Sequence, residues 1–212
     1  MSDDIFEPIS QGSDRAQDEE NSRIEAITNE LRRRCKLYEA QFGNSQPHVS
    51  HFEVEQRVSE SYAKEQGLWL PMERTFGLGT PGPSGSENDT YVSNDIIFKV
   101  NNLLNSGSIL GLLEKVKMHN IIFPDTFYQF YAFTGFDGRT IMPIIKQDLV
   151  KNATPATQIM IDTYMAALGF EKASGVGCFS NGDFLVWDVV PRNVLVDSEG
   201  DVFVVDAEIK RI

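Results

Sequence analysis

The chain has 212 residues, of which 41% are hydrophobic and 24% are charged, and its formal net charge is −12. This composition is typical of a soluble globular protein, and the excess of acidic groups disfavours binding to the phosphates of nucleic acids. No apolar stretch approaches the roughly 18 residues that would span a membrane, and the acidic N-terminus carries no secretory signal. Because Cys35 and Cys178 are the only cysteines, we expect the chain to work in a reducing cytoplasm.

The N-terminal part is predicted to be a polar leader followed by a helix. Residues 1–20 are acidic and poor in apolar groups, so we expect them to be disordered. Over residues 21–42 apolar side chains recur at three- and four-residue steps, which predicts one amphipathic helix. We therefore separate residues 1–50, the leader and its helix, from a folded domain over residues 51–212.

The rest of the chain is predicted to contain clustered helices and strands. We expect helices over 52–66, 108–119 and 154–168, strands over 91–92, 96–100, 127–133 and 140–145, a turn at 136–139, and a strand-rich final segment. Gly67 is placed to end the first of these helices, Thr154 followed by Pro155 is placed to begin the last one, and Gly169 is placed to end it. Because the elements come in clusters, the sequence predicts an α+β fold.

The final hairpin carries the clearest chemical signal. A turn over Asp197–Gly200 would fold the chain back so that Asp206 lies opposite Pro191 and near Arg192 and Asn193, with Asp188 on the same loop. A carboxylate and a carboxamide oxygen are ligands that Mg²⁺ accepts, and a second carboxylate can take a proton from an attacking hydroxyl. This set suits phosphoryl transfer, and a surface hairpin with polar ends is the alternative interpretation.

Upstream residues could complete such a site. Lys99, in a strand of apolar residues, is a candidate phosphate-binding lysine, and the turn at Gly85 and Ser86 could cover phosphates with its backbone N–H groups. Glu114, on the helix predicted after that strand, could pair with Lys99. The alternatives are a lysine that extends from a strand edge to solvent and a glutamate on a solvated helix face.

Taken in order, these segments resemble the serine/threonine/tyrosine kinase domain found in polyvalent proteins of phages and mobile elements. The matching segments are Ser61–Lys64, Gly67–Trp69, Gly85–Tyr91, Lys99, His119–Pro124, Gln147, Leu168–Phe170 and Asp188–Asp206. The spacing of Asp188, Asn193 and Asp206 also matches the catalytic loop and metal-binding aspartate of protein kinases. The resemblance covers roughly residues 51–212 and implies a protein-kinase-like fold, with a small antiparallel-sheet lobe and a reduced C-terminal lobe.

The resemblance also implies roles for single residues in an ATP- and Mg²⁺-dependent site. Asp188 would be the catalytic aspartate, aided by Lys99, and Asn193 and Asp206 would hold the metal. The nucleotide would be bound by Gly85, Ser86, Lys99, Glu114 and Gln147. Gln147 lies in the stretch 144–149, which would form the hinge that meets adenine. The partners implied are a nucleotide and a hydroxyl acceptor, either a protein or a small molecule, with neither nucleic acid nor membrane expected.

The sequence departs from ordinary protein kinases in ways that leave alternatives open. Trp187 precedes the catalytic aspartate where many kinases have arginine, and Asp206-Ala207-Glu208 replaces Asp-Phe-Gly. Ile212 follows Asp206 by only six positions, whereas ordinary protein kinases bind their peptide with a segment beyond this point. The alternatives to this assignment are therefore a nucleotide-binding pseudokinase or interaction module, a small-molecule kinase, and a structural protein that uses its N-terminal helix.

Overall fold

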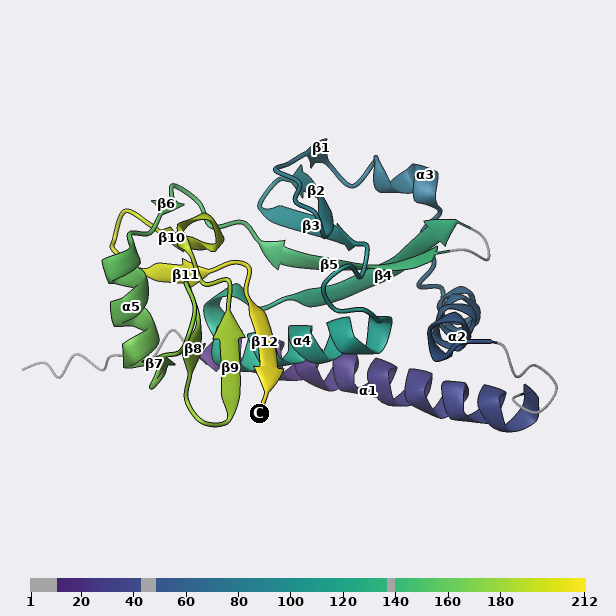
Figure 1. Cartoon of the computed structure of the whole chain (residues 1–212). Coiled ribbons are helices and arrows are strands. Elements are labelled where there is room, and N and C mark those ends of the chain that lie inside the picture. Colours follow the sequence, from purple (N-terminus) through teal and green to yellow (C-terminus); the bar gives the residue numbers. More distant parts are fainter. Residues whose placement is uncertain (1–10, 43–48, 137–139) are drawn as a thin grey trace, which may run out of the picture.

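The computed structural model describes residues 11–42, 49–136 and 140–212 (Figure 1). The helices are α1 (Gln11–Phe42), α2 (His51–Glu65), α3 (Met72–Thr75), α4 (Ile109–Ile122) and α5 (Gln158–Ala167), with short 3₁₀ turns at Pro124–Thr126 and Pro191–Asn193. The strands are β1 (Thr80–Pro81), β2 (Asn88–Ser93), β3 (Ile96–Asn101), β4 (Gln129–Phe136), β5 (Thr140–Asp148), β6 (Thr154–Pro155), β7 (Glu171–Lys172), β8 (Phe179–Ser180), β9 (Phe184–Trp187), β10 (Val194–Val196), β11 (Val202–Val204) and β12 (Glu208–Arg211). None of the helices in these ranges is long and apolar enough to cross a membrane.

One half of the molecule is built on an antiparallel sheet with the strand order β1-β2-β3-β5-β4. The hairpin between β2 and β3 was expected, and it turns at Asn94, whose φ of 53° suits a tight hairpin turn. β3 lies between β2 and β5, so Lys99 stands on a central strand rather than at an edge. The predicted turn at 136–139 falls largely on residues 137–139, which lie outside the described part of the chain.

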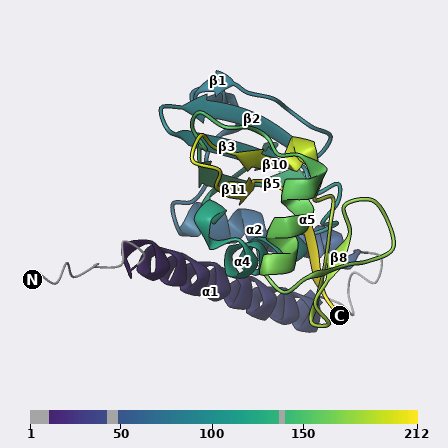
Figure 2. The ribbon, with the colours of Figure 1, turned by 90° about the vertical axis from the view of Figure 1, so that its left-hand side faces the viewer.

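Helices α1, α2 and α4 lie on one face of this sheet and share its core. Figure 2 shows α4 lying between α1 and the sheet, and the core places Ile24 and Leu31 of α1 against Leu113 of α4, Phe133 of β4 and Ile145 of β5. These side chains are all 3% exposed or less, so the helices and the sheet share one apolar core.

The other half contains α5 and two small sheets, with the strand orders β11-β10-β6 and β12-β9-β8-β7. Its own core includes Ile161 and Met165 of α5 together with Val186 of β9. Ile122, at the end of α4, also belongs to this second core. Helix α4 therefore connects the two halves, which together form the mixed helix and antiparallel-sheet arrangement expected of an α+β fold.

The N-terminal helix begins earlier than the sequence predicts. Residues 11–20 were expected to be disordered, but they are helical because tertiary contacts support them. The Glu20 carboxylate accepts a hydrogen bond from the Phe130 backbone N–H (2.8 Å), and the Gln17 side chain donates to the Asn120 carbonyl. Helix α1 also shares an apolar core with α4.

The N-terminal cap of helix α5 lies three residues later than predicted. Thr154 and Pro155 were expected to open the helix, but they form β6 and pair with Val196 and Leu195 of β10. Thr157 caps the helix instead, because the chain must first leave the strand. The predicted helix ends were correct, since Gly169 follows α5 with a φ of +82°, as Gly67 follows α2 with a φ of +67°.

Candidate functional site

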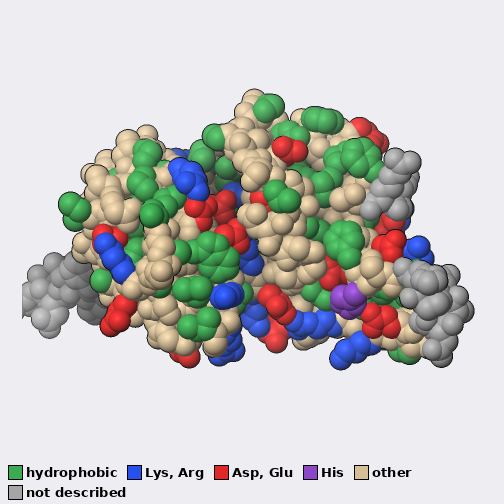
Figure 3. All heavy atoms as spheres, in the orientation of Figure 1, with side chains coloured by type: hydrophobic (Ala, Val, Ile, Leu, Met, Phe, Trp, Pro, Cys, Tyr) green, Lys and Arg blue, Asp and Glu red, His purple; other side chains and the backbone are tan. Residues whose placement is uncertain are grey.

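A cavity of about 570 Å³ lies between the two halves of the molecule. Its walls come from the turn over residues 83–88, from β3, from the loop before β10 and from the segment between β11 and β12. The sequence-predicted residues that line it are Gly85, Ser86, Lys99, Asp188, Asn193 and Asp206. Acidic side chains gather on the surface along the boundary between the halves (Figure 3). The fold therefore brings most of the predicted site into one cavity.

The loop from Asp188 to Asn193 holds the side chains of these two residues together. The Asn193 amide Nδ2 donates to the Asp188 backbone carbonyl and to Asp188 Oδ2, both at 2.8 Å. Arg192 forms an ion pair with the other carboxylate oxygen, Asp188 Oδ1. Asp188 adopts a φ of +62°, which is uncommon for a residue other than glycine, and these contacts stabilise that conformation.

Asp206 is placed beside this loop by the hairpin of β10 and β11. The strands pair Val194 with Val204, so Asp206 falls opposite Arg192, one position away from the predicted partner. The Val205 N–H donates to the Asn193 carbonyl oxygen at 2.9 Å, which fixes the two segments side by side. The Asp206 carboxylate forms no hydrogen bond or ion pair with any residue that the structure describes.

The donor atoms near Asp206 suit a magnesium ion in part. Because Nδ2 of Asn193 faces Asp188, its Oδ1 is left as an acceptor, and a carboxamide and a carboxylate oxygen are both hard ligands. Within residues 11–42, 49–136 and 140–212, no three His, Cys, Asp or Glu side chains gather as a metal site. An ion held by Asn193 and Asp206 would therefore take its remaining ligands from a bound molecule or water, as Mg²⁺ commonly does.

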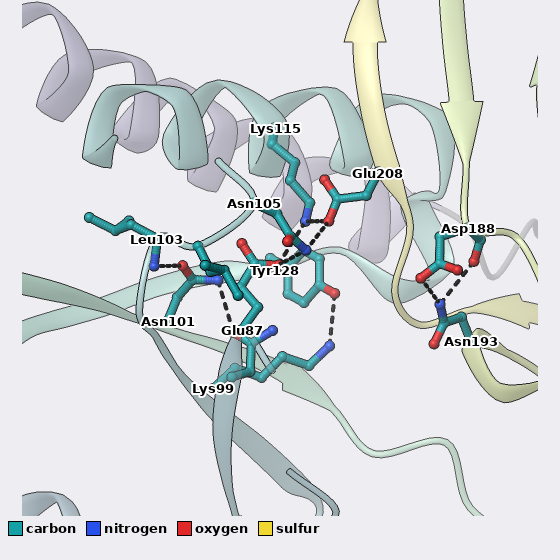
Figure 4. Close-up of polar contacts among 12 residues, drawn as sticks. Glu87, Lys99, Asn101, Leu103, Asn105, Lys115, Tyr128, Asp188, Asn193 and Glu208 are labelled. Atoms are coloured by element: carbon teal, nitrogen blue, oxygen red, sulfur yellow. Dashed lines mark hydrogen bonds and ion pairs between the residues drawn. The ribbon is translucent and has the colours of Figure 1, made fainter. Parts of the chain in front are cut away.

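Lys99 extends from β3 into the base of the cavity and is only 6% exposed. Its ammonium donates to the Tyr128 hydroxyl at 2.8 Å and to the Val205 carbonyl oxygen at 2.9 Å (Figure 4). Burial lowers the pKa of Lys99, and the nearby Asp206 carboxylate acts in the opposite direction. Tyr128 is held in turn by Asn120 of α4, whose side chain bonds both the N–H and the carbonyl of Tyr128.

The predicted pair between Lys99 and Glu114 is not formed. Glu114 lies on the outer face of α4, where its half-exposed carboxylate forms an ion pair with Arg32 of α1. The next residue, Lys115, points inward and is 9% exposed. Consecutive residues on a helix are about 100° apart, so Glu114 and Lys115 cannot face the same way, and it is Lys115 that points inward.

Lys115 is the centre of a polar cluster with Glu87, Asn105 and Glu208, which we refer to as the Lys115 cluster; Lys115 and Glu87 are buried, Glu208 is half-buried and Asn105 is exposed (Figure 4). The Lys115 ammonium lies 2.7 Å from Glu208 Oε1 and 3.5 Å from Glu87 Oε2, and Asn105 Nδ2 donates to both oxygens at 3.0 Å. Burial disfavours the ammonium, but the carboxylates of Glu208, Glu87 and Asp206 outweigh it and raise the pKa of Lys115. The surroundings of Lys115 therefore favour its charged form beside the cavity.

The turn over residues 83–88 is pinned by its own hydrogen bonds. The Gly85 N–H donates to the Asn88 carbonyl at 3.1 Å, so this amide is already engaged. The Ser86 carbonyl accepts from the Asn102 side chain at 2.7 Å, whereas the Ser86 N–H bonds no described residue. Of the two predicted contacts, Ser86 thus has the amide that is available to an anion.

Gln147 is not brought into the cavity. It lies within β5, 2% exposed, and its side chain donates to the Thr126 carbonyl at 2.5 Å. The predicted hinge over residues 144–149 is mostly strand, and its last residue, Leu149, is the one that lines the cavity. There it joins three further apolar lining residues, Val92, Ile97 and Leu195.

Several residues of the site were missed from the sequence. Lys115 follows Leu112 by three positions and precedes His119 by four, so it falls on the buried stripe of α4, where a charge indicates a buried partner. Arg192 could have been found from its place between Asp188 and Asn193. Tyr128 and Glu208 carry no local signal, because their contacts join distant parts of the chain.

A known family model matches most of the chain. Residues 53–211 match the family model described as "Serine/Threonine/Tyrosine Kinase found in polyvalent proteins". The match spans the cavity and all its predicted residues, and α1 lies outside it. No curated protein matches the chain.

Proposed function

Because the chain belongs to the family of serine/threonine/tyrosine kinases found in polyvalent proteins, we propose that it transfers the terminal phosphoryl group of ATP to a hydroxyl acceptor with the help of Mg²⁺. One observation carries this proposal: Lys99, Asp188, Asn193 and Asp206, which are up to 107 positions apart in the sequence, line a single cavity. Phosphoryl transfer needs little more from a protein than positioning and charge neutralisation, and these residues supply both.

The nucleotide is proposed to enter with its base between the apolar lining residues. Val92, Ile97, Leu149 and Leu195 offer apolar surface from both halves of the molecule, which suits a flat aromatic base. The phosphates then lie toward Lys99 and the free N–H of Ser86. The anion would stabilise the charged form of Lys99 and so offset the effect of its burial.

Asn193 and Asp206 are proposed to hold Mg²⁺ against the phosphates. When bound, the ion neutralises negative charge on the phosphate oxygens as the terminal group is transferred. Asn193 is oriented for this role by Asp188, because both hydrogen atoms of its amide nitrogen face that residue. Asp206 is prepared for it because its carboxylate has no protein partner in the described chain.

Asp188 is proposed to accept the proton of the acceptor hydroxyl. The hydroxyl oxygen forms a bond to the terminal phosphorus, the bond from that phosphorus to the bridging oxygen breaks, and ADP leaves with the electron pair. Each Asp188 oxygen has one partner, Asn193 for Oδ2 and Arg192 for Oδ1, and each keeps a second lone pair that can accept the proton. Arg192 is the mobile partner because its side chain is largely exposed, and a guanidinium binds phosphate oxygens as a fork.

Turnover of ATP labelled on the terminal phosphate tests this proposal. We expect Mg²⁺-dependent release or transfer of label, and the variant Asp188→Asn should reduce the rate by about 10²- to 10⁴-fold because it removes the general base. Asp183→Asn is the matched control, since Asp183 precedes β9 and does not line the cavity. An unchanged rate in Asp188→Asn would remove the assigned role, and binding of ATP without turnover would indicate the pseudokinase alternative.

A further inference from the structure

The Lys115 cluster joins three walls of the cavity to helix α4. Glu87 belongs to the turn over residues 83–88, Asn105 to the connection between β3 and α4, and Glu208 to the first position of β12. All three line the cavity, and Lys115 reaches them from α4 (Figure 4). The cluster is therefore placed to set the distance between the helix, the turn and the final strands.

The two carboxylates of the cluster depend on Lys115 for charge compensation. Glu87 is 5% exposed, and its Oε1 is buried without a hydrogen-bond partner in the described chain. Its Oε2 and Glu208 Oε1 share the same two donors, Lys115 and Asn105. Of these donors only Lys115 carries a charge, so without it two carboxylates would face each other with no cation between them.

Glu208 is linked through the backbone to both aspartates of the proposed reaction. It follows Asp206 by two positions, and the intervening Ala207 is buried, which leaves a short link with little freedom. In the sheet its backbone pairs with Trp187, the residue directly before Asp188. Any shift of Glu208 is therefore transmitted to both Asp206 and Asp188.

On this basis, and resting on the proposed function, we infer that Lys115 is a positioning residue for Mg²⁺: by holding Glu208 it fixes Asp206, and by holding Glu87 it fixes the turn over the phosphates. The link runs from a lysine on α4 to a glutamate beside the metal-binding aspartate. The charges are exchanged relative to the predicted contact, in which α4 would have supplied a glutamate to Lys99; here α4 supplies the lysine. Lys99 needs no such partner, since Tyr128 and Val205 hold its ammonium.

The test is a titration of Mg²⁺ at a fixed concentration of ATP, read by calorimetry, on wild type and Lys115→Met. Removing a positive charge near a cation site would by itself tighten Mg²⁺ binding. A positioning role predicts the reverse, a loss of about 10-fold or more in apparent Mg²⁺ affinity, as is typical when a residue that orients a ligand is removed. Binding of ATP without Mg²⁺ should change much less, and Lys115→Arg should restore most of the loss.

Two further variants keep the test decisive. Asn105→Ala removes a neutral donor at an exposed position, so it is expected to fold and to weaken Mg²⁺ binding in the same direction without any change of charge. Lys117→Met is the matched control on the same helix, because Lys117 pairs with Glu25 of α1 and does not contact the cluster. It should bind Mg²⁺ and ATP as wild type does.

The outcomes separate this inference from the proposed function. If wild type shows no Mg²⁺-dependent binding of ATP, the proposed function fails and the inference fails with it. If wild type does bind but Lys115→Met binds Mg²⁺ equally well or more tightly, the proposed function stands and the positioning role is overturned. Should Lys115→Met not fold, Asn105→Ala decides, and unchanged Mg²⁺ affinity in that variant overturns the inference.

Discussion

The two faces of helix α4 carry ion pairs in different surroundings. On the outer face, Glu114 pairs with Arg32 and Lys117 pairs with Glu25, both across to α1, and these side chains are between 35% and 54% exposed. On the inner face, Lys115 is buried among carboxylates of the cavity wall. Exposed pairs are screened by water and salt, whereas a buried charge that loses its partner has no substitute.

This difference shows why residue type alone did not identify the side chain of α4 that reaches the candidate site. Glu114 and Lys115 are neighbours in sequence, and Glu114 fits the charge expected of a partner for Lys99. The direction of the side chain decides instead, because only Lys115 faces the cavity wall. The outer pairs attach α1, and the inner cluster connects α4 to the candidate site.

The largest effect is expected from breaking the inner cluster. Lys115→Met should lower the free energy of unfolding by about 3–5 kcal/mol, because the buried Glu87 and the half-buried Glu208 lose the cation that they share. Lys117→Met on the outer face should leave the urea midpoint close to that of wild type, because its pair is solvent-screened. Equal losses in the two variants, measured by urea unfolding, would show that the faces do not differ as proposed.

A second test extends the comparison to the sheet, where Lys99 faces the cavity and Lys146 does not. Lys99→Met should raise the Kd for ATP about 10- to 100-fold, the range expected when a charged hydrogen bond is lost. Lys146→Met is the control, because Lys146 pairs with Phe98 in the neighbouring strand and so lies on the other face of the sheet. Similar affinities in the two variants would place the phosphates elsewhere.

The smallest effect concerns His119, the buried histidine of α4. Burial lowers the pKa of His119 to about 3, and the charge of Lys99 adds to the effect. An unfolded chain binds a proton at this histidine below about pH 6.5 and the folded chain does not, so stability falls as the pH falls through this range. From pH 7.5 to 5.5 the loss should be about 1.4 kcal/mol.

Urea unfolding of wild type and His119→Gln at the two pH values measures this loss. The difference between their pH dependences isolates His119 from other groups, such as Glu55, whose burial raises its pKa and acts in the opposite direction. Identical pH dependences would mean that His119 is protonated as readily in the folded protein as in the unfolded chain.

Local signals in the sequence were sufficient for much of the fold. The hairpin around Asn94 and the helix ends at Gly67 and Gly169 follow from turn and capping chemistry within a few residues. The gathering of Asp188, Asn193 and Asp206 was also predictable, because one short hairpin joins them, and only its register differed by one position.

The remaining features depend on contacts between distant segments. Residues 11–20 look disordered by composition, yet their helix is supported by Phe130 and Asn120, more than 100 positions away. Thr154 is a good helix cap by type, but pairing with β10 takes it into a strand. The same holds for the roles of Tyr128 and Glu208, since sequence patterns report local structure and not which partners meet in the core.

The central claim is that this cavity binds ATP together with Mg²⁺, and calorimetry of ATP binding with and without Mg²⁺ tests it most directly. Wild type should bind ATP more tightly when Mg²⁺ is present, and Asp206→Asn should lose that gain because a metal-binding carboxylate is removed. Asp201→Asn, on the same hairpin but outside the cavity, should behave as wild type. The absence of ATP binding in wild type, or an undiminished Mg²⁺ effect in Asp206→Asn, would contradict the claim.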